Sequence, residues 1–228
     1  NAGIPLFALA YPDLPEAVRI TDINAGLAIA AYERVTLANL APFQQWLRGN
    51  HKAMSEAQVR GAKVFFGKGN CTACHTGPAL NSMTFYSLGM TDFFGPDILG
   101  SGRLNPERLG RGGFSGAPQD MYKFKTPQLY NLVDSPFYGH GGNFNTVREV
   151  VEYKNLAVSE NAFVPASAIA AEFVPLSLSS SEVDDLVAFL EEGLYDAHLD
   201  RYEPYDLLPS GQCTPVNDPL SRSELGCD

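Results

Sequence analysis

The stretch Cys71-Thr72-Ala73-Cys74-His75 has the spacing Cys-x-x-Cys-His, which is typical of a c-type haem attachment site. Two thiols at this spacing can bond to two vinyl groups on one edge of a porphyrin, and the adjacent imidazole can ligate the iron. The stretch therefore predicts one covalently bound haem c with His75 as the proximal iron ligand. It also decides the fold, because the chain around it must build a domain that encloses this group.

Two other kinds of site use a Cys-x-x-Cys pair. A structural zinc site needs a second pair of Cys or His ligands, and the remaining cysteines, Cys213 and Cys227, lie far away in the C-terminal tail. A thioredoxin-like redox pair is expected in a βαβ unit, which the flanking Gly-Lys-Gly-Asn and Thr-Gly-Pro segments do not supply. The context therefore favours haem.

Composition and charge restrict the class of protein. The chain has 228 residues, of which 45% are hydrophobic and 11% aromatic, so it can bury a substantial core. Its net charge of −10 makes nucleic acid and anionic membranes poor partners. That charge either suits a basic redox partner or serves only solubility. No apolar stretch is long enough to span a bilayer, and no signal-like segment precedes Asn1, so we expect a mature or trimmed product.

The tail indicates the compartment. Cys213 and Cys227 lie in a segment rich in Pro, Gly, Ser and Asp, where a disulfide between them is plausible. Two free, buried thiols are the alternative, which so polar a segment disfavours. Covalent haem and a disulfide both indicate a periplasmic or extracellular protein.

Helix signals recur along the chain, whereas no run of residues alternates as a strand would, so we expect an all-α fold. Helices are predicted after the capping residues Thr21, Ser55, Thr146 and Ser179, with a short one over residues 41–47. The helix after Ser55 ends in a Gly-Lys-Gly turn just before the haem motif.

Apolar spacing predicts how two of these helices pack, and composition predicts a long loop. The helix after Thr21 repeats apolar residues every four positions, and the one after Ser179 continues on a single apolar face to Leu194. Residues 81–126 are rich in Gly, Pro, Asn, Asp and Ser, so we expect a long irregular loop that wraps a haem edge.

Three blocks of sequence extend the pattern beyond the haem motif. The first block is residues 57–80, with Val64-Phe65-Phe66-Gly67 before the motif and Gly77-Pro78 after it. The second is residues 109–142, which contain Leu109-Gly110-Arg111, Tyr122-Lys123-Phe124-Lys125-Thr126-Pro127-Gln128-Leu129-Tyr130-Asn131, Ser135-Pro136 and Gly139-His140-Gly141-Gly142. The third is residues 11–49, with Ile29-Ala30-Ala31-Tyr32-Glu33-Arg34 at the centre. In order and spacing, these blocks resemble the bacterial di-haem cytochrome c peroxidases and their MauG-type relatives. The Lys-Thr-Pro and His-Gly-Gly blocks are the most specific parts of the resemblance, which covers most of residues 11–195.

The resemblance implies three parts. Residues 1–50 are expected to close a first haem domain and to supply a linker, residues 51–200 to form the second, cytochrome c domain, and residues 201–228 to be an extended tail. The family has two haem motifs and this chain has one, so the peroxidatic haem is expected on an N-terminal portion before Asn1. The alternative is a mono-haem derivative.

The leading functional hypothesis is the electron-transfer portion of a periplasmic di-haem peroxidase. Electrons from a small cytochrome c or a cupredoxin would pass through this haem to the peroxidatic one, which reduces hydrogen peroxide to water. One alternative is a MauG-type oxidase that withdraws electrons from a protein Tyr or Trp, and another is a mono-haem electron carrier. Expected partners are the N-terminal haem domain, the donor and, in a homodimer, a second copy.

The second iron ligand departs from the family pattern. The family places Met or Tyr on the helix that follows the His-x-Gly segment, and the matching position here holds Lys154. Val147, Val150 and Val151 form an apolar stripe whose next member is Lys154, so this lysine is expected to point inward. The alternative is that it reaches water at the helix end. Met121, Met90 and Tyr153 are the reserve candidates.

Other residues receive roles from the resemblance or from their charge. Arg111, Lys123 and Lys125 could pair with haem propionates or remain solvated. Asp134 and Pro136 lie where the family places ligands of an interdomain calcium. His140 resembles a site residue near the haem, and a structural, hydrogen-bonded histidine is the alternative. We predict no role for His51 and His198.

Overall fold

The computed structural model describes residues 3–92 and 105–199. The predicted Cys213–Cys227 disulfide lies outside them. The chain divides into two compact units, one formed by Asn1–Leu37 with His198–Asp228 and the other by Ala38–Ala197. The haem motif and every candidate ligand of its iron lie in the second unit.

The described residues are mainly helical, which confirms the all-α class. The first unit holds α1 (Gly3–Ala10), a 3-10 turn (Glu16–Val18) and α2 (Asp22–Val35). The second holds α3 (Pro42–Leu47), α4 (Glu56–Phe66), α5 (Arg111–Ser115), α6 (Val147–Leu156) and α7 (Ser180–Ala188). Its short turns are Cys71–Ala73, Pro106–Leu109, Pro118–Asp120, Leu132–Asp134, Ala166–Ala168 and the π-helical Phe189–Gly193. Its strands, β1 (Phe85–Tyr86) and β2 (Phe124–Lys125), pair antiparallel.

Capping boxes start the three longest helices of the second unit where the sequence predicts. The hydroxyl of Ser55 accepts from the backbone N–H of Gln58, whose side-chain oxygen accepts from the N–H of Ser55. Thr146 begins α6 and Ser179 begins α7 with the same reciprocal pair of bonds. Each box satisfies two N–H groups that a helix start leaves without a partner.

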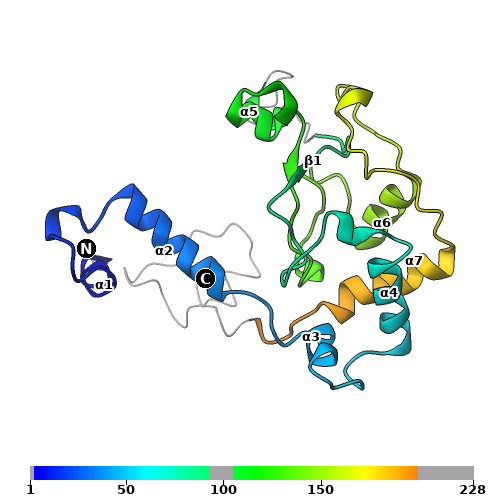
Figure 1. Cartoon of the computed structure of the whole chain (residues 1–228), viewed down its shortest axis with the longest axis horizontal. Coiled ribbons are helices and arrows are strands. Elements are labelled where there is room, and N and C mark those ends of the chain that lie inside the picture. Colours follow the sequence, from blue (N-terminus) through cyan, green and yellow to red (C-terminus); the bar gives the residue numbers. More distant parts are fainter. Residues whose placement is uncertain (1–2, 93–104, 200–228) are drawn as a thin grey trace, which may run out of the picture. The chain divides into compact units, whose positions relative to one another are not determined.

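The core of the second unit forms where α4 lies against α7 (Figure 1). Gly61 permits the close approach, because a Cβ there would overlap the carbonyl oxygen of Asp185 and lie 2.7 Å from the Cβ of Phe189. The Phe189 ring is fully buried and meets Phe43 and Phe65 edge to face, with centroids 5.2 and 5.6 Å away. This aromatic cluster anchors the helix that leads into the haem motif.

The last helix differs from the prediction of one continuous helix to Leu194. The α-helix ends at Ala188 and a π-helical turn follows, in which the N–H of Leu194 donates to the carbonyl of Phe189. The wider turn keeps Phe189, Leu190 and Leu194 all buried. Apolar spacing alone therefore predicted the buried face correctly but not the change in helical pitch.

The predicted loop at residues 81–126 contains more local structure than expected. Its described part holds β1, β2, α5 and two 3-10 turns, tied together by a parallel bridge between Gly110 and Lys123. These elements are two to five residues long, too short to produce a periodic pattern that the sequence could reveal.

In the first unit, α2 begins at the predicted residue, since the hydroxyl of Thr21 accepts from the N–H of Asn24. Its apolar residues do not form a core, because Ile23 and Leu27 are exposed whereas Asn24 is buried. Tyr11 closes the unit by donating its hydroxyl to the carbonyl of Asn24.

Candidate haem site

The haem motif follows the C-terminal end of α4. The N–H groups of Gly67 and Gly69 both donate to the carbonyl of Val64, which turns the chain off the helix. A Cβ on Gly69 would lie 2.8 Å from that carbonyl oxygen, so a glycine is required there. The motif itself then coils, because the N–H groups of Cys74 and His75 donate to the carbonyl of Cys71.

The imidazole of His75 is held in one orientation. It is buried, and its Nδ1 lies 2.9 Å from the carbonyl oxygen of Leu80. A carbonyl can only accept, so Nδ1 carries the proton and the lone pair of a neutral ring is on Nε2. Burial, reinforced by the charge of Lys154, lowers the pKa of His75 to about 4, so the ring is neutral at physiological pH. This state suits a metal ligand whose second nitrogen is oriented by a backbone carbonyl.

Cys71 and Cys74 are half-buried and are not joined to each other. Burial raises the pKa of Cys71 to about 11 and also raises that of Cys74, whereas the charge of Lys154 opposes both shifts. Both sulfurs are therefore protonated thiols at neutral pH. This disfavours a reactive thiolate pair of the thioredoxin kind.

A cavity of about 570 Å³ opens beside the motif. Its volume is within the usual range for a site that holds a small molecule or cofactor. Cys74 and His75 line one part of it, and Val147, Val150 and Val151 of α6 line another. Apolar side chains predominate, so the cavity matches a porphyrin that is bonded at one edge and ligated from one face.

Lys154 continues the valine stripe of α6 and lines the same cavity. Burial lowers the pKa of its amine, and the two cysteines oppose that shift. The side chain thus lies close to Cys71, Cys74 and His75.

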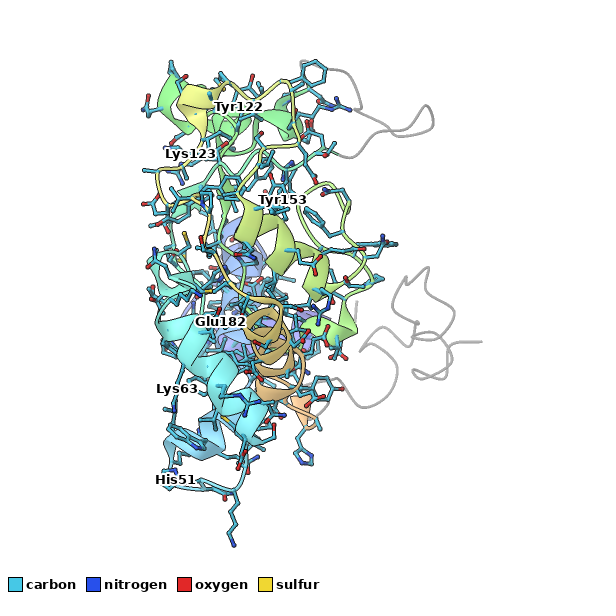
Figure 2. All side chains as sticks on the ribbon, turned by 90° about the vertical axis from the view of Figure 1, so that its right-hand side faces the viewer. His51, Lys63, Tyr122, Lys123, Tyr153 and Glu182 are labelled. Atoms are coloured by element: carbon cyan, nitrogen blue, oxygen red, sulfur yellow. The ribbon has the colours of Figure 1, made fainter. Side chains whose placement is uncertain are left out.

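The reserve ligands are distributed differently. Met90 lines the cavity and lies next to Gly139, where an added Cβ would be 3.4 Å from its sulfur. Met121 packs over Gly112 of α5 and is not among the residues that line the cavity. Tyr153, labelled in Figure 2, is buried. Its hydroxyl donates to the carbonyl of Leu88 (2.6 Å), and its ring packs against Phe144.

A polar network that the sequence analysis did not find lies at the same cavity. Nε2 of His140 is 3.0 Å from one carboxylate oxygen of Asp92, and the amide of Asn161 donates to the other. The His140 ring stacks on Phe124 at 3.7 Å between centroids. His140 is therefore a hydrogen-bonded histidine that also borders the cavity. Asp92 and Asn161 are 69 residues apart, so no local motif could have linked them.

Only one of the three predicted propionate partners lines the cavity. Lys125 does so, and its ammonium donates to the carbonyl of Thr126. Arg111 instead pairs with Asp120 (3.1 Å) and lies over the ring of Phe85. Lys123 lines a separate hollow, and Figure 2 shows it with Tyr122 at one end of the unit and His51 at the other.

The two predicted calcium ligands are not among the residues that line the cavity. The carboxylate of Asp134 accepts from the amide of Asn131, and Pro136 is exposed nearby. Within residues 3–92 and 105–199, no group of three or more His, Cys, Asp or Glu side chains is arranged to hold a metal ion. His51 packs edge-on against Trp46, and His198 belongs to the other unit.

Known proteins with similar sequences give the family. The chain is 32% identical to the cytochrome-c peroxidase IdrP1 of Denitromonas iodatirespirans, over 82% of this chain and 54% of that protein. It is 30% identical to the methylamine utilization protein MauG of Methylophilus methylotrophus, over 82% of this chain and 50% of the relative. The chain belongs to the di-haem cytochrome c peroxidase and MauG family. This confirms the resemblance that the motif blocks carry.

The structure of one family member supports the fold. A MauG-like protein associated with microbial copper homeostasis superposes with a TM-score of 0.64 at 23% identity, covering 86% of this chain and 59% of that one. The all-α, cytochrome c-type fold is thereby confirmed. No protein-family model matches the chain.

The chain spans about half the length of the two peroxidase-family relatives compared above. In the part of the chain that the structure describes, no helix has the length and apolar character needed to cross a membrane.

Proposed function

We propose that Cys71 and Cys74 bind a haem c through thioether bonds and that Nε2 of His75 ligates its iron. The observation that carries this proposal is the cavity of about 570 Å³ that Cys74 and the oriented ring of His75 line. When bound, haem c supplies one-electron redox chemistry. The valines of α6 exclude water from it, and the carbonyl of Leu80 fixes the imidazole against rotation.

For the whole protein, we propose a periplasmic di-haem peroxidase in which this chain is the C-terminal, electron-transfer portion. The named cytochrome-c peroxidase among its relatives supports this role, as does the fraction of that relative that the chain covers. A small cytochrome c or cupredoxin would donate the electrons, and the charge of −10 favours a basic donor surface. The final electron acceptor would be hydrogen peroxide at a second haem.

The exposed apolar side of α2 fits this division. Ile23 and Leu27 are exposed, and a first haem domain whose last segment is residues 1–50 could cover them. Residues 51–200 would then form the second haem domain. Asp134 and Pro136 remain proposed contributors to an interdomain calcium site, and a homodimer remains a proposed assembly.

The test uses the longest form of the protein that its host makes. A pyridine haemochrome assay should give two haems per polypeptide, and peroxide should be consumed in proportion to oxidation of a reduced small cytochrome c. Replacing His75 by Ala should abolish donor oxidation. One haem per complete protein would reject the di-haem peroxidase in favour of a mono-haem carrier.

A MauG-type oxidase is the second candidate, because MauG of Methylophilus methylotrophus is nearly as similar to the chain as the peroxidase is. Such an enzyme would withdraw electrons from Tyr or Trp of a protein. Oxidation of a protein substrate on peroxide addition, without turnover of reduced cytochrome c, would favour it over the peroxidase.

A further inference from the structure

We propose that the ε-amine of Lys154 is the second axial ligand of the haem iron, opposite His75. The proposal rests on the proposed haem site and deepens it by naming the ligand. A haem that is attached but not ligated by Lys154 would contradict this inference alone.

The position of Lys154 is set by the helix that carries it. The capping box at Thr146 fixes where α6 starts, and the side chains three and four residues apart then share one face. Val147, Val150 and Val151 line the cavity on that face, and Lys154 follows one turn later. The amine consequently enters the space that Cys74 and His75 also border.

Within the described residues, the Lys154 amine has no competing partner. Among the residues that the structure describes, no carboxylate, carbonyl or hydroxyl bonds with Lys154, and its only electrostatic neighbours are the two cysteines and His75. An ammonium group in an apolar cavity without a counter-ion is costly, whereas a neutral amine has a lone pair that a metal can accept. Iron between His75 and Lys154 would provide that acceptor.

Contacts exclude two of the three other candidates, Tyr153 and Met121. Tyr153 is one residue away, but its hydroxyl is bonded to Leu88 and its ring packs on Phe144 and Phe173. Met121 lies over Gly112, away from the cavity. Met90 does line the cavity, beside Gly139 and two residues from the bonded Asp92, and the Met90→Leu variant below tests it.

Ligation by an amine has a chemical consequence. A haem iron that binds two protein nitrogens in addition to the four porphyrin nitrogens has no open coordination position. This haem would therefore transfer electrons without binding peroxide itself. A thioether ligand raises the reduction potential of a haem, so an amine in its place predicts a lower potential. Lys154 would thus lower the reduction potential of the haem and also occupy the coordination position that peroxide would need.

The experiment uses the complete protein with its haems attached and follows the haem bound at Cys71 and Cys74. Absorption, EPR and near-infrared magnetic circular dichroism spectra should identify a low-spin ferric haem with imidazole and amine ligands in the wild-type protein. Lys154→Ala should open the iron, raise the high-spin fraction and increase the affinity for added imidazole by about tenfold or more, because the competing ligand is gone. Lys154→Met should restore a low-spin haem with the charge-transfer band of a sulfur ligand and a higher midpoint potential.

Three variants serve as comparisons. Lys63→Met removes an exposed lysine of α4 (Figure 2) and should leave the spectra unchanged. Met90→Leu and Tyr153→Phe should also retain the wild-type ligand signature. The proposal is overturned if the haem bound at Cys71 and Cys74 is high-spin or carries a sulfur or phenolate ligand in the wild-type protein, or if Lys154→Ala keeps the wild-type spectrum. The wild-type spectra alone decide the matter if the Lys154 variants fail to fold.

Discussion

The helices α2 and α4 have similar local sequence signals, but the apolar side of α4 is buried and that of α2 is exposed. Each follows a hydroxyl cap and repeats apolar residues at helical spacing. Val64 and Phe65 of α4 are buried within its unit, whereas Ile23 of α2 is 75% exposed. Caps and periodicity therefore predict that a helix forms and which side is apolar, but they do not say what surface covers that side.

The largest expected effect is a loss of stability when a buried apolar side chain is truncated, compared with the same truncation of an exposed side chain on α2. Phe189→Ala should lower the free energy of unfolding of the Ala38–Ala197 unit by about 3–5 kcal/mol, because a fully buried ring leaves a cavity. Ile23→Ala should change it by less than about 0.5 kcal/mol, because that side chain is exposed. Urea denaturation followed by circular dichroism measures both. Equal losses would show that the exposed side of α2 is packed in solution.

A glycine in each helix gives a second contrast. Gly61→Ala should cost on the order of 3 kcal/mol, since its new methyl group would overlap the backbone of Asp185. Gly26→Ala should stabilise α2 by up to about 1 kcal/mol, because no atom lies within 4 Å of the added Cβ and alanine favours a helix. Thermal melts of the two variants check the signs. A stable Gly61→Ala protein would contradict the close approach of α4 and α7.

The start of the second unit depends on a buried carboxylate. Oδ2 of Asp196 accepts the N–H groups of Asn39 (2.9 Å) and Leu40 (3.0 Å). Asp196→Ala should lower the free energy of unfolding by about 2 kcal/mol, because two backbone donors lose their partner. The exposed Asp13, replaced by Ala, is the matched control and should have little effect. Hydrogen exchange should accelerate at Asn39 and Leu40 in the Asp196 variant only.

The smallest expected effect is a change in how the free energy of unfolding depends on pH. The ammonium of Lys68, with the backbone N–H of Ser179, lowers the pKa of Glu182 to about 2 from its usual 4.5. A depressed carboxyl pKa stabilises the fold above pH 4.5, and this contribution is lost as the pH falls toward 2. Glu182→Gln should therefore flatten the dependence of unfolding free energy on pH between these values. An unchanged pH profile would contradict the ion pair, and exposed Glu107→Gln is the control.

The sequence could predict what depends on neighbours in the chain. Capping residues predicted where α4, α6 and α7 begin, and the valine stripe predicted that Lys154 points inward. Contacts between distant segments left no such trace. The Asp92–His140 pair joins residues 48 positions apart and depends on tertiary packing. Even the short-range bond from His75 to the carbonyl of Leu80 depends on backbone direction, which single-residue patterns do not encode.

The same limit explains the candidates that lie away from the cavity. Arg111 and Lys123 belong to the family blocks and carry the right charge for propionates. Whether such a cation reaches a site depends on the turns before it, and here Arg111 meets Asp120 instead.

The central claim, that Cys71 and Cys74 bind a haem covalently above His75, is tested most directly by the mass of the denatured chain. The protein should be produced in a host with a haem c maturation system. For the 228-residue chain the account predicts the polypeptide mass plus one haem in the wild type, and the bare polypeptide mass in a Cys71→Ser, Cys74→Ser double variant. A wild-type chain at its bare mass, or a double variant that retains the haem through denaturation, would contradict it.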